Sequence, residues 1–175
     1  MDLSETCKVV TSQLLQPKIE GEVAFILKSD LSGGKVTPED VRNATDFVVA
    51  AFEIVDSRVE DWRIKLVDTI SDNASSGRYI LGRKRVDIGD IDLPSVSMKF
   101  YKNGNLVGEG TGAAVLGDPA VSVAWLANRL WNYGVTLKSG EVILSGAFSA
   151  APPAEKGDEF MADFGPLGTV TAQFI

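Results

Sequence analysis

Apolar and polar residues alternate along much of this chain, which is the period-two pattern of strands with one buried face. The alternation is clearest in SVSMKFYKNGNLVGEGTG, residues 95–112, where it continues on both sides of Asn103-Gly104. Asn-Gly is the dipeptide most typical of a two-residue hairpin turn, so this stretch predicts a β-hairpin. Further strands are predicted at 18–27, at 50–58, at 78–81, and in EVILSG, DEFMADFG and GTVTAQFI near the end of the chain.

Apolar residues at helical spacing occur in VTPEDVRNATDFVVAAF, residues 36–52. Thr37 is a suitable N-cap, and Pro38 suits the first helical position because no intrahelical partner is needed for its missing N–H. The residues that recur at helical spacing are Val41, Ala44, Val48 and Ala51. This pattern predicts a helix that packs one face inward.

A second helix is predicted in GDPAVSVAWLANRLWNYG, residues 117–134. Asp118 can cap it, Pro119 can begin it, and Gly134 can end it. Its two large aromatic residues are expected in the core or at an interface; they are Trp125 and Trp131.

The remaining stretches complete the predicted organisation. A short helix or turn is expected near residues 61–69, and the polar stretch SDNASSG after it predicts a loop. Residues 1–17 read as an irregular lead-in, and residues 18–175 are long enough for a single domain with its own core. The sum is a β-rich α+β fold with two principal helices.

Two absences narrow the possible chemistry. The chain has no histidine and one cysteine, Cys7, so it contains no Ser-His-Asp or Cys-His triad and no zinc site of the usual Cys/His type. A disulfide within the chain is impossible, which favours a reducing, cytoplasmic setting. The protein ligands of any bound metal must then be oxygens, and oxygen ligands favour Mg²⁺, Mn²⁺ or Ca²⁺.

Charge and hydropathy argue against nucleic-acid and membrane partners. The net charge is −7, and no run of lysine or arginine offers a phosphate-binding surface. No apolar run approaches the roughly 20 residues of a membrane-spanning helix. The first residues, MDLSETCKVV, lack the basic start and apolar run of a secretion signal.

Three glutamates stand out among the charged residues. Glu20 and Glu22 lie two apart in the predicted strand KIEGEVAF, so their side chains point to the same face. Glu53 lies in an apolar stretch, and a buried glutamate is rare unless it is paired or bound to metal. If the two strands are neighbours, the three carboxylates form a site for a hard cation. The alternative is that the first two line the solvated face of an edge strand.

Three stretches resemble a known family: QPKIEGEVAFILKSDL, AFEIVDSRVEDWRIKLVDTISDNASSG and GAAVLGDPAVSVAWLANRLWNYGVTLKSGEVILSGAF. They are similar to the 2-keto-4-pentenoate hydratase and 4-oxalocrotonate decarboxylase family, which is related to fumarylacetoacetate hydrolase. The resemblance extends over residues 14–174. It implies a β-roll of mixed sheets and a Mg²⁺ or Mn²⁺ ion held by Glu20, Glu22 and Glu53.

The resemblance also implies a function. A divalent-metal-dependent hydratase, a lyase, would add water to 2-hydroxypenta-2,4-dienoate-type 2-oxo acids in the meta-cleavage degradation of aromatic compounds. A 4-oxalocrotonate-type decarboxylase is the alternative, because one metal site can serve both reactions. Members of the family assemble into oligomers and with each other, so a homo-oligomer or a complex with a related subunit is expected.

Smaller expectations concern the residues around the metal. In the DNASSG loop, Ser75 is expected to hydrogen-bond the substrate or a water, with Asn73 behind it, although a polar loop that caps itself is an equal alternative. Lys65 could offer its charge to a carboxylate, or be an exposed helix lysine. Asp56 and Arg58 are expected to form an ion pair that supports the strand of Glu53.

One feature departs from the family. Residues 1–17 do not match the family's N-terminal region, which carries a lysine in a K-I-G context and part of the active-site cover. A non-catalytic or half-site metal-binding subunit is therefore a further alternative.

Overall fold

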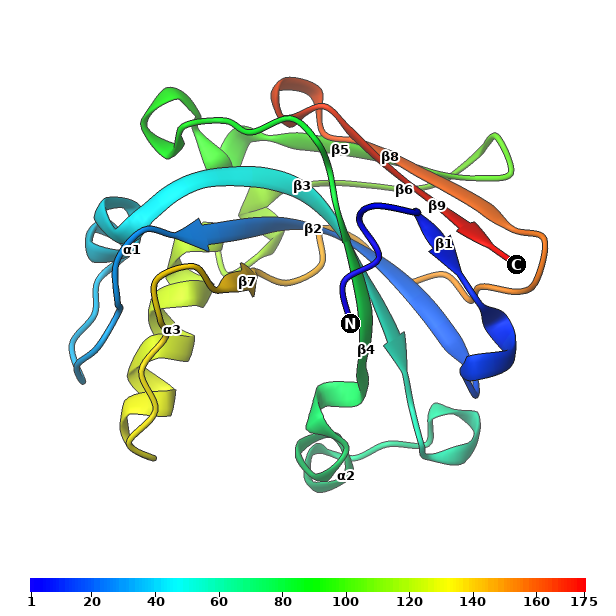
Figure 1. Ribbon diagram of the computed structural model, residues 1–175, viewed down its shortest axis with the longest axis horizontal. Coiled ribbons are helices and arrows are strands. Elements are labelled where there is room, and N and C mark those ends of the chain that lie inside the picture. Colours follow the sequence, from blue (N-terminus) through cyan, green and yellow to red (C-terminus); the bar gives the residue numbers. More distant parts are fainter.

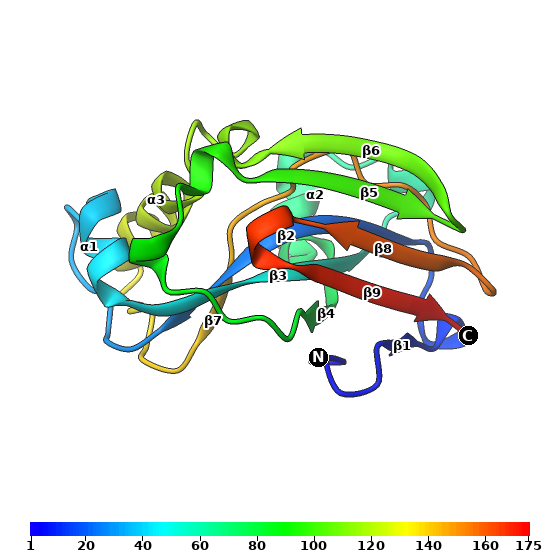
Figure 2. The same ribbon diagram turned by 90° about the horizontal axis from the view of Figure 1, so that it is seen from above.

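The core of the protein lies between two β-sheets. The computed structural model describes residues 1–175, and its strands are β1 (Lys8–Val9), β2 (Pro17–Leu27), β3 (Thr45–Asp56), β4 (Ser76–Leu81), β5 (Ser97–Lys102), β6 (Asn105–Thr111), β7 (Val142–Leu144), β8 (Glu159–Asp163) and β9 (Thr169–Phe174). The first sheet has the order β1-β9-β8-β5-β6 and the second has the order β4-β3-β2-β7. Figures 1 and 2 show the two sheets stacked face to face. The prediction of a β-rich fold with mixed sheets is confirmed.

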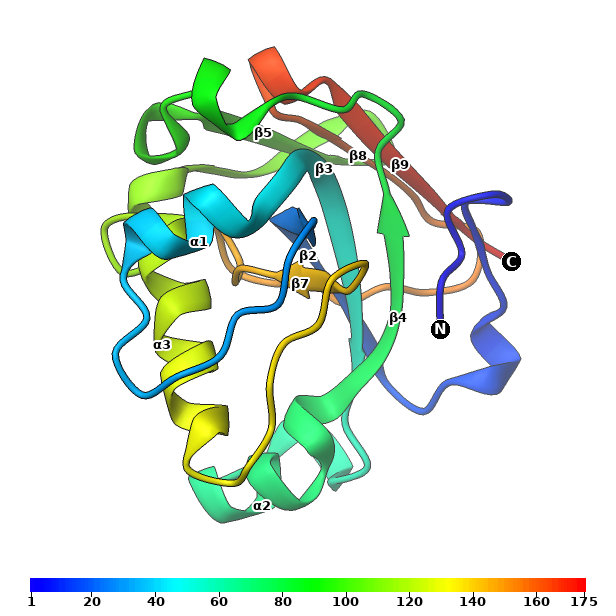
Figure 3. The same cartoon turned by 60° about the vertical axis from the view of Figure 1, so that its left-hand side comes forward.

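The helices are few and mostly short. They are α1 (Pro38–Ala44), α2 (Leu66–Ser71) and α3 (Pro119–Trp131), with 3-10 helices at Thr11–Gln13, Glu60–Trp62, Asn73–Ser75, Ile88–Asp90, Leu93–Ser95, Gly112–Ala114 and Gly165–Leu167. α1 and α3 lie together at one end of the sheets (Figure 3). Asn128 of α3 binds the segment just before α1, since its side chain accepts a hydrogen bond from Val36 N and donates one to Val36 O. None of these helices has the length and apolar character needed to cross a membrane.

Aromatic side chains fill the space between the sheets. Phe52 of β3 and Phe100 of β5 lie with ring centroids 5.3 Å apart, and Phe100 in turn contacts Phe160 of β8. All three side chains are fully or almost fully buried. Burial of such large apolar surfaces is the main favourable contribution to folding, so this cluster fixes how the second sheet sits on the first.

The predicted helix at 36–52 is correct only in its first half. Thr37 caps α1 through a capping box with Asp40, but the helix ends at Ala44 and β3 begins at Thr45. The Thr45 hydroxyl donates to the carbonyl of Val41, which satisfies one of the carbonyls at the helix end. From this point β3 pairs with β2 along its whole length, so tertiary pairing overrides the helical spacing of the following residues.

Other predicted elements are confirmed. The 95–112 hairpin is β5–β6, with positive φ angles of 52° at Asn103 and 79° at Gly104, as a type I′ turn requires. Asp118 caps α3 by accepting a hydrogen bond from Ala120 N.

The predicted core placement of two aromatic residues is wrong, because Trp125 is 60% exposed and Trp131 is 47% exposed. Their outward position leaves the interface alternative as a prediction.

Residues 1–17 are more regular than predicted. Lys8 and Val9 form β1, which pairs in parallel with β9. Before it, the backbone runs along the outer edge of β4, where Leu3 N donates to Tyr79 O and Tyr79 N donates to Met1 O. The sequence gives a weak signal here because a two-residue strand is too short for a visible alternation. This segment closes an edge of each sheet.

Candidate metal centre

The three glutamates lie on one face of the second sheet. Glu20 of β2 is directly opposite Glu53 of β3, and Glu22 is opposite Ala51 in the same ladder. Residues directly opposite in an antiparallel pair point to the same face, as do residues two apart on one strand. One carboxylate oxygen from each glutamate lies within 4.8 Å of the others. The register of one strand pair therefore brings all three carboxylates together.

Gly21 explains how two glutamates can flank a position that faces the core. A Cβ atom at Gly21 would lie 2.3 Å from the sulfur of Met98 and 3.5 Å from the ring of Phe164, both in or next to the first sheet. No side chain fits there without displacing the buried Met98. The glycine lets the two sheets approach each other directly behind the carboxylates.

The glutamates belong to the interior of the sheet, not to a solvated edge. β2 and β3 are the two central strands of the order β4-β3-β2-β7. Glu22 is 2% exposed, and Glu20 and Glu53 are partly buried. The edge-strand alternative is therefore wrong. Three small apolar residues buried on the same face pack beyond the carboxylates, and they are Ala24, Val49 and Ala51.

Burial and mutual repulsion raise the pKa values of all three carboxyl groups. Burial raises the pKa of Glu20, opposed in part by a hydrogen bond with Glu22 and by the charge of Lys18. Burial, and then the charge of Glu53, raise the pKa of Glu22 well above its ordinary value, although Gly146 N donates a 2.7 Å hydrogen bond to it. Burial and the charge of Glu20 raise the pKa of Glu53 to about 7. None of the ion pairs in the structure involves these groups.

The donor set fits a hard divalent cation. All the available ligand atoms are carboxylate oxygens, which Mg²⁺, Mn²⁺ and Ca²⁺ accept. Three buried or partly buried carboxylates with no cation paired to them are costly to ionise together. A bound divalent cation would remove that cost. A purely structural role would not explain why three carboxylates are buried together.

Ser75 occupies a buried and strained position. It is 2% exposed, and its Oγ donates a 2.9 Å hydrogen bond to Asp72 Oδ2. Asn73, Ala74 and Ser75 have consecutive φ angles of 51°, 55° and 56°, in the left-handed region that residues other than glycine rarely adopt. Such strain persists only where surrounding contacts enforce it, and it concentrates at functional sites.

The other two predicted site residues are on the surface. Asn73 is exposed, in the turn just before Ser75. Lys65 is exposed at the N-cap of α2, where its backbone N–H is bonded to Asp68. Neither side chain forms a hydrogen bond or ion pair with the three carboxylates. The structure thus brings the three glutamates together and leaves Lys65 and Asn73 outside their contacts.

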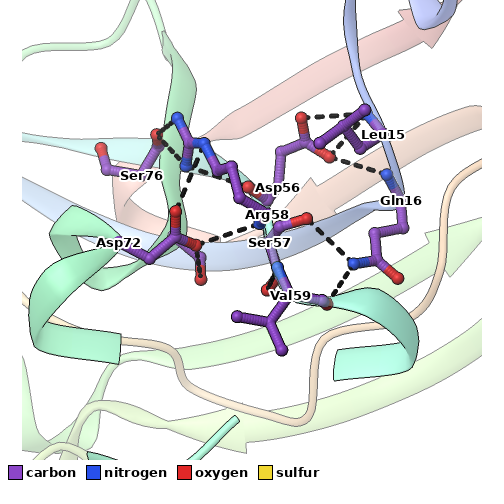
Figure 4. A network of polar contacts seen from close by, with 9 residues as sticks. Leu15, Gln16, Asp56, Ser57, Arg58, Val59, Asp72 and Ser76 are labelled. Atoms are coloured by element: carbon purple, nitrogen blue, oxygen red, sulfur yellow. Dashed lines mark hydrogen bonds and ion pairs between the residues drawn. The ribbon is translucent and has the colours of Figure 1, made fainter. Parts of the chain in front are cut away.

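The predicted ion pair between Asp56 and Arg58 is wrong. Arg58 instead lies with its Nε 3.4 Å from Asp72 Oδ1, and its backbone N–H donates to Asp72 Oδ2 (Figure 4). Asp56 accepts hydrogen bonds from the backbone N–H groups of Leu15 and Gln16. The two charges are used for separate long-range contacts, so Asp72 is a supporting residue that sequence reasoning missed.

Gly146 is the second contact that the sequence does not reveal. Its N–H binds Glu22, 124 positions away in the chain, and this contact depends on where the segment after β7 is placed. Its φ of 114° is a conformation that glycine adopts without strain. The only sequence signal is that Gly146 is the last residue of the predicted strand EVILSG.

Comparison with known proteins gives consistent relatives. The family described as fumarylacetoacetate (FAA) hydrolase C-terminal matches residues 4–175. The chain is 50% identical to a 2-hydroxyhexa-2,4-dienoate hydratase of Comamonas testosteroni, over 92% of this chain and 61% of the relative. It is 42% identical to 2-keto-4-pentenoate hydratase 1 of Dechloromonas aromatica (strain RCB), over 95% of this chain and 63% of the relative.

A solved structure gives the same result for the fold. The 4-oxalocrotonate decarboxylase from Pseudomonas putida G7, complexed with magnesium and adipate, superposes with a TM-score of 0.93 at 39% sequence identity. The match covers 96% of this chain and 64% of that structure. The chain thus spans a little over three-fifths of the length of the relatives it matches.

Proposed function

The chain belongs to the fumarylacetoacetate hydrolase C-terminal family. From this premise we propose that it acts as a divalent-metal-dependent hydratase, which is a lyase. The reaction would be the addition of water to 2-hydroxypenta-2,4-dienoate-type acids, in meta-cleavage degradation of aromatic compounds. The observation that carries the proposal is the convergence of Glu20, Glu22 and Glu53 on one sheet face without a paired cation. The names of the hydratase relatives support the choice of reaction.

The chain's own residues would prepare the site in three ways. Glu20, Glu22 and Glu53 would hold Mg²⁺ or Mn²⁺, with Glu22 fixed in place by the Gly146 N–H. A bound divalent ion supplies Lewis-acid stabilisation of the negative charge that develops on a 2-oxo group. The small buried side chains of Ala24, Val49 and Ala51 keep water away from the sheet beside the carboxylates, which strengthens electrostatic interactions there.

Ser75 is the residue we propose to hydrogen-bond the substrate or a water. Its hydroxyl is held by Asp72, so it can accept a further hydrogen bond without searching among rotamers. Asn73 would support the turn from the solvent side. Lys65 would contribute only positive charge, because it is exposed at the N-cap of α2.

A decarboxylase is the second candidate. The similarity to the magnesium-complexed 4-oxalocrotonate decarboxylase favours it, since that structure and this chain share the fold closely.

The assembly and location are part of the same proposal. We expect a homo-oligomer or a complex with a related subunit, and the exposed Trp125 and Trp131 of α3 supply apolar surface for such a contact. We place the protein in the cytoplasm, because its single cysteine, Cys7, is free.

The test is turnover of 2-hydroxypenta-2,4-dienoate by the purified chain with added Mn²⁺ or Mg²⁺. Glu22→Gln should lower kcat at least about 100-fold and weaken Mn²⁺ binding, because a neutral amide replaces the most deeply buried carboxylate. Glu109→Gln, an exposed glutamate on β6, is the matched control and should act as wild type. Bound metal without turnover of the dienoate, but with turnover of 4-oxalocrotonate, would move the assignment to decarboxylase. Bound metal with neither reaction would overturn the enzyme proposal.

A further inference from the structure

Lys18 shares the sheet face of the three glutamates. It lies two residues before Glu20 on β2, so alternation places its side chain on the same side as Glu20 and Glu22. Its neighbours across the strand are Val55 of β3 and Pro153 on the opposite side, and neither carries a charge. Lys18 is the positive group close enough to act on the carboxylate of Glu20.

The Lys18 ammonium has no hydrogen-bonding partner in the structure. It is partly buried, yet it forms no ion pair and donates no hydrogen bond in the structure. Its contact is instead the face of Trp62, with Nζ 4.4 Å from the ring centroid. A cation–π contact holds a charge in place without using its N–H donors. Three donors therefore remain for an anion.

Hydrogen bonds fix the position of Trp62. Its indole N–H donates a 2.9 Å hydrogen bond to Gln16 O. Gln16 in turn donates from its backbone to Asp56 and from its side chain to Ser57 O, as Figure 4 shows. Trp62 has a φ of 54°, in the left-handed region, which these contacts maintain. The ring is held as a platform beside the start of β2.

The net charge of a metal-loaded site explains why a lysine is needed on this face. Three ionised carboxylates exceed the charge of one divalent cation by one unit, so a loaded site would still repel an anionic substrate. Lys18 supplies the missing positive charge on the same face. If it served only to neutralise Glu20, a direct ion pair would be expected, and none is present.

We propose that Lys18 is a substrate-binding residue, whose ammonium, held over Trp62, binds the carboxylate of the 2-oxo or 2-hydroxydienoate acid next to the metal ligands. This inference rests on the proposed function, because it takes the substrate class from it. It adds a residue outside the metal ligands and outside the Ser75 loop. Specificity for a carboxylate at this point would come from Lys18.

The test measures anion binding directly and does not depend on turnover. Oxalate, a dicarboxylate that mimics the 2-oxo acid group, is titrated by calorimetry into the chain saturated with Mn²⁺. Lys18→Met keeps the length of the side chain and removes its charge, so the oxalate Kd should rise about 10-fold or more. Lys18→Arg should stay within about 3-fold of wild type. Lys28→Met, an exposed lysine just beyond the other end of β2, is the matched control and should change nothing.

Mn²⁺ titration of the same variants distinguishes a failure of the Lys18 inference from a failure of the proposed function. Lys18→Met should bind Mn²⁺ at least as tightly as wild type, because removal of a neighbouring positive charge favours a cation. That result also shows that the variant is folded. Equal oxalate affinity in wild type and Lys18→Met, with Mn²⁺ bound to both, would overturn this inference alone. Failure of the wild-type chain to bind Mn²⁺ would overturn the proposed function, and this inference with it.

Discussion

Glu53→Gln should stabilise the metal-free protein at alkaline pH, although it removes a proposed metal ligand. Burial and the charge of Glu20 raise the pKa of Glu53 from 4.5 to about 7. The folded protein therefore holds a proton that the unfolded chain releases between these two values. Stability from this group is fully present below about pH 4.5 and is lost as the pH rises through about 7. Glutamine stays neutral, so the variant lacks this loss.

The size of the effect follows from the shift. A change from 4.5 to about 7 corresponds to about 3.4 kcal/mol at the conversion of 1.36 kcal/mol per pKa unit. Glu53 is only partly buried, so screening by water reduces the expected gain to roughly 1–3 kcal/mol. For a chain of this length, that gain corresponds to a rise of roughly 3–10 °C in Tm.

Thermal unfolding in EDTA, followed by circular dichroism at pH 5.5 and pH 8.5, measures the effect. Wild type should lose stability between the two pH values, and Glu53→Gln should lose less because the contribution of Glu53 is absent. The exposed Glu109→Gln control should follow wild type. Mn²⁺ at 100 times its Kd should then stabilise wild type by about 2.7 kcal/mol and the variant far less. If Glu53→Gln is less stable than wild type at pH 8.5 without metal, repulsion within the cluster is not the cost we infer.

Three further substitutions test the surrounding structure. Gly21→Ala should lower the free energy of unfolding, measured in urea, by about 1–3 kcal/mol, because the new Cβ would displace the sulfur of Met98. In the double variant, Met98→Ala should recover part of that loss, and strictly additive losses would contradict the contact. Asp118→Ala should lower the free energy of unfolding by about 1 kcal/mol, because α3 loses its N-cap. Asp118→Asn should retain most of the wild-type stability, because asparagine can also cap a helix. Asp72→Ala should speed amide exchange at residues 72–76, because the hydroxyl of Ser75 loses its acceptor; unchanged exchange would show that the turn holds itself.

Short sequence patterns predict those elements whose conformation is determined by the residues within them. The Asn103-Gly104 turn was identified because its two positive φ angles require particular residues. The common face of Glu20 and Glu22 was predictable from strand alternation alone. The helix at 36–52 was overextended because helical spacing and a buried strand cannot be distinguished over a short apolar run.

Contacts between distant segments could not be predicted in this way. Asp56 and Arg58 are two residues apart, so sequence proximity suggested a pair, but each finds its partner in another segment. The donation from Gly146 to Glu22 depends on the path of the chain after β7. Lys18 was unremarkable in the sequence because its role depends on Trp62, which a left-handed turn brings over it.

The sheet order explains why the cluster stays assembled despite its repulsion. On an edge strand, two neighbouring glutamates could separate by local fraying, since only one ladder holds the strand. At Glu53, β3 pairs with β2 on one side and with β4 on the other. Beside the glutamates, the segment after β7 holds β2 through a hydrogen bond from Phe148 N–H to Gly21 O, and Gly21 packs β2 tightly against the first sheet. Repulsion between Glu20 and Glu53 therefore cannot be relieved by movement of the backbone. It is relieved by a proton or a cation, so the same ladder that makes the ionised cluster costly also keeps the three proposed ligands close enough to share one metal ion.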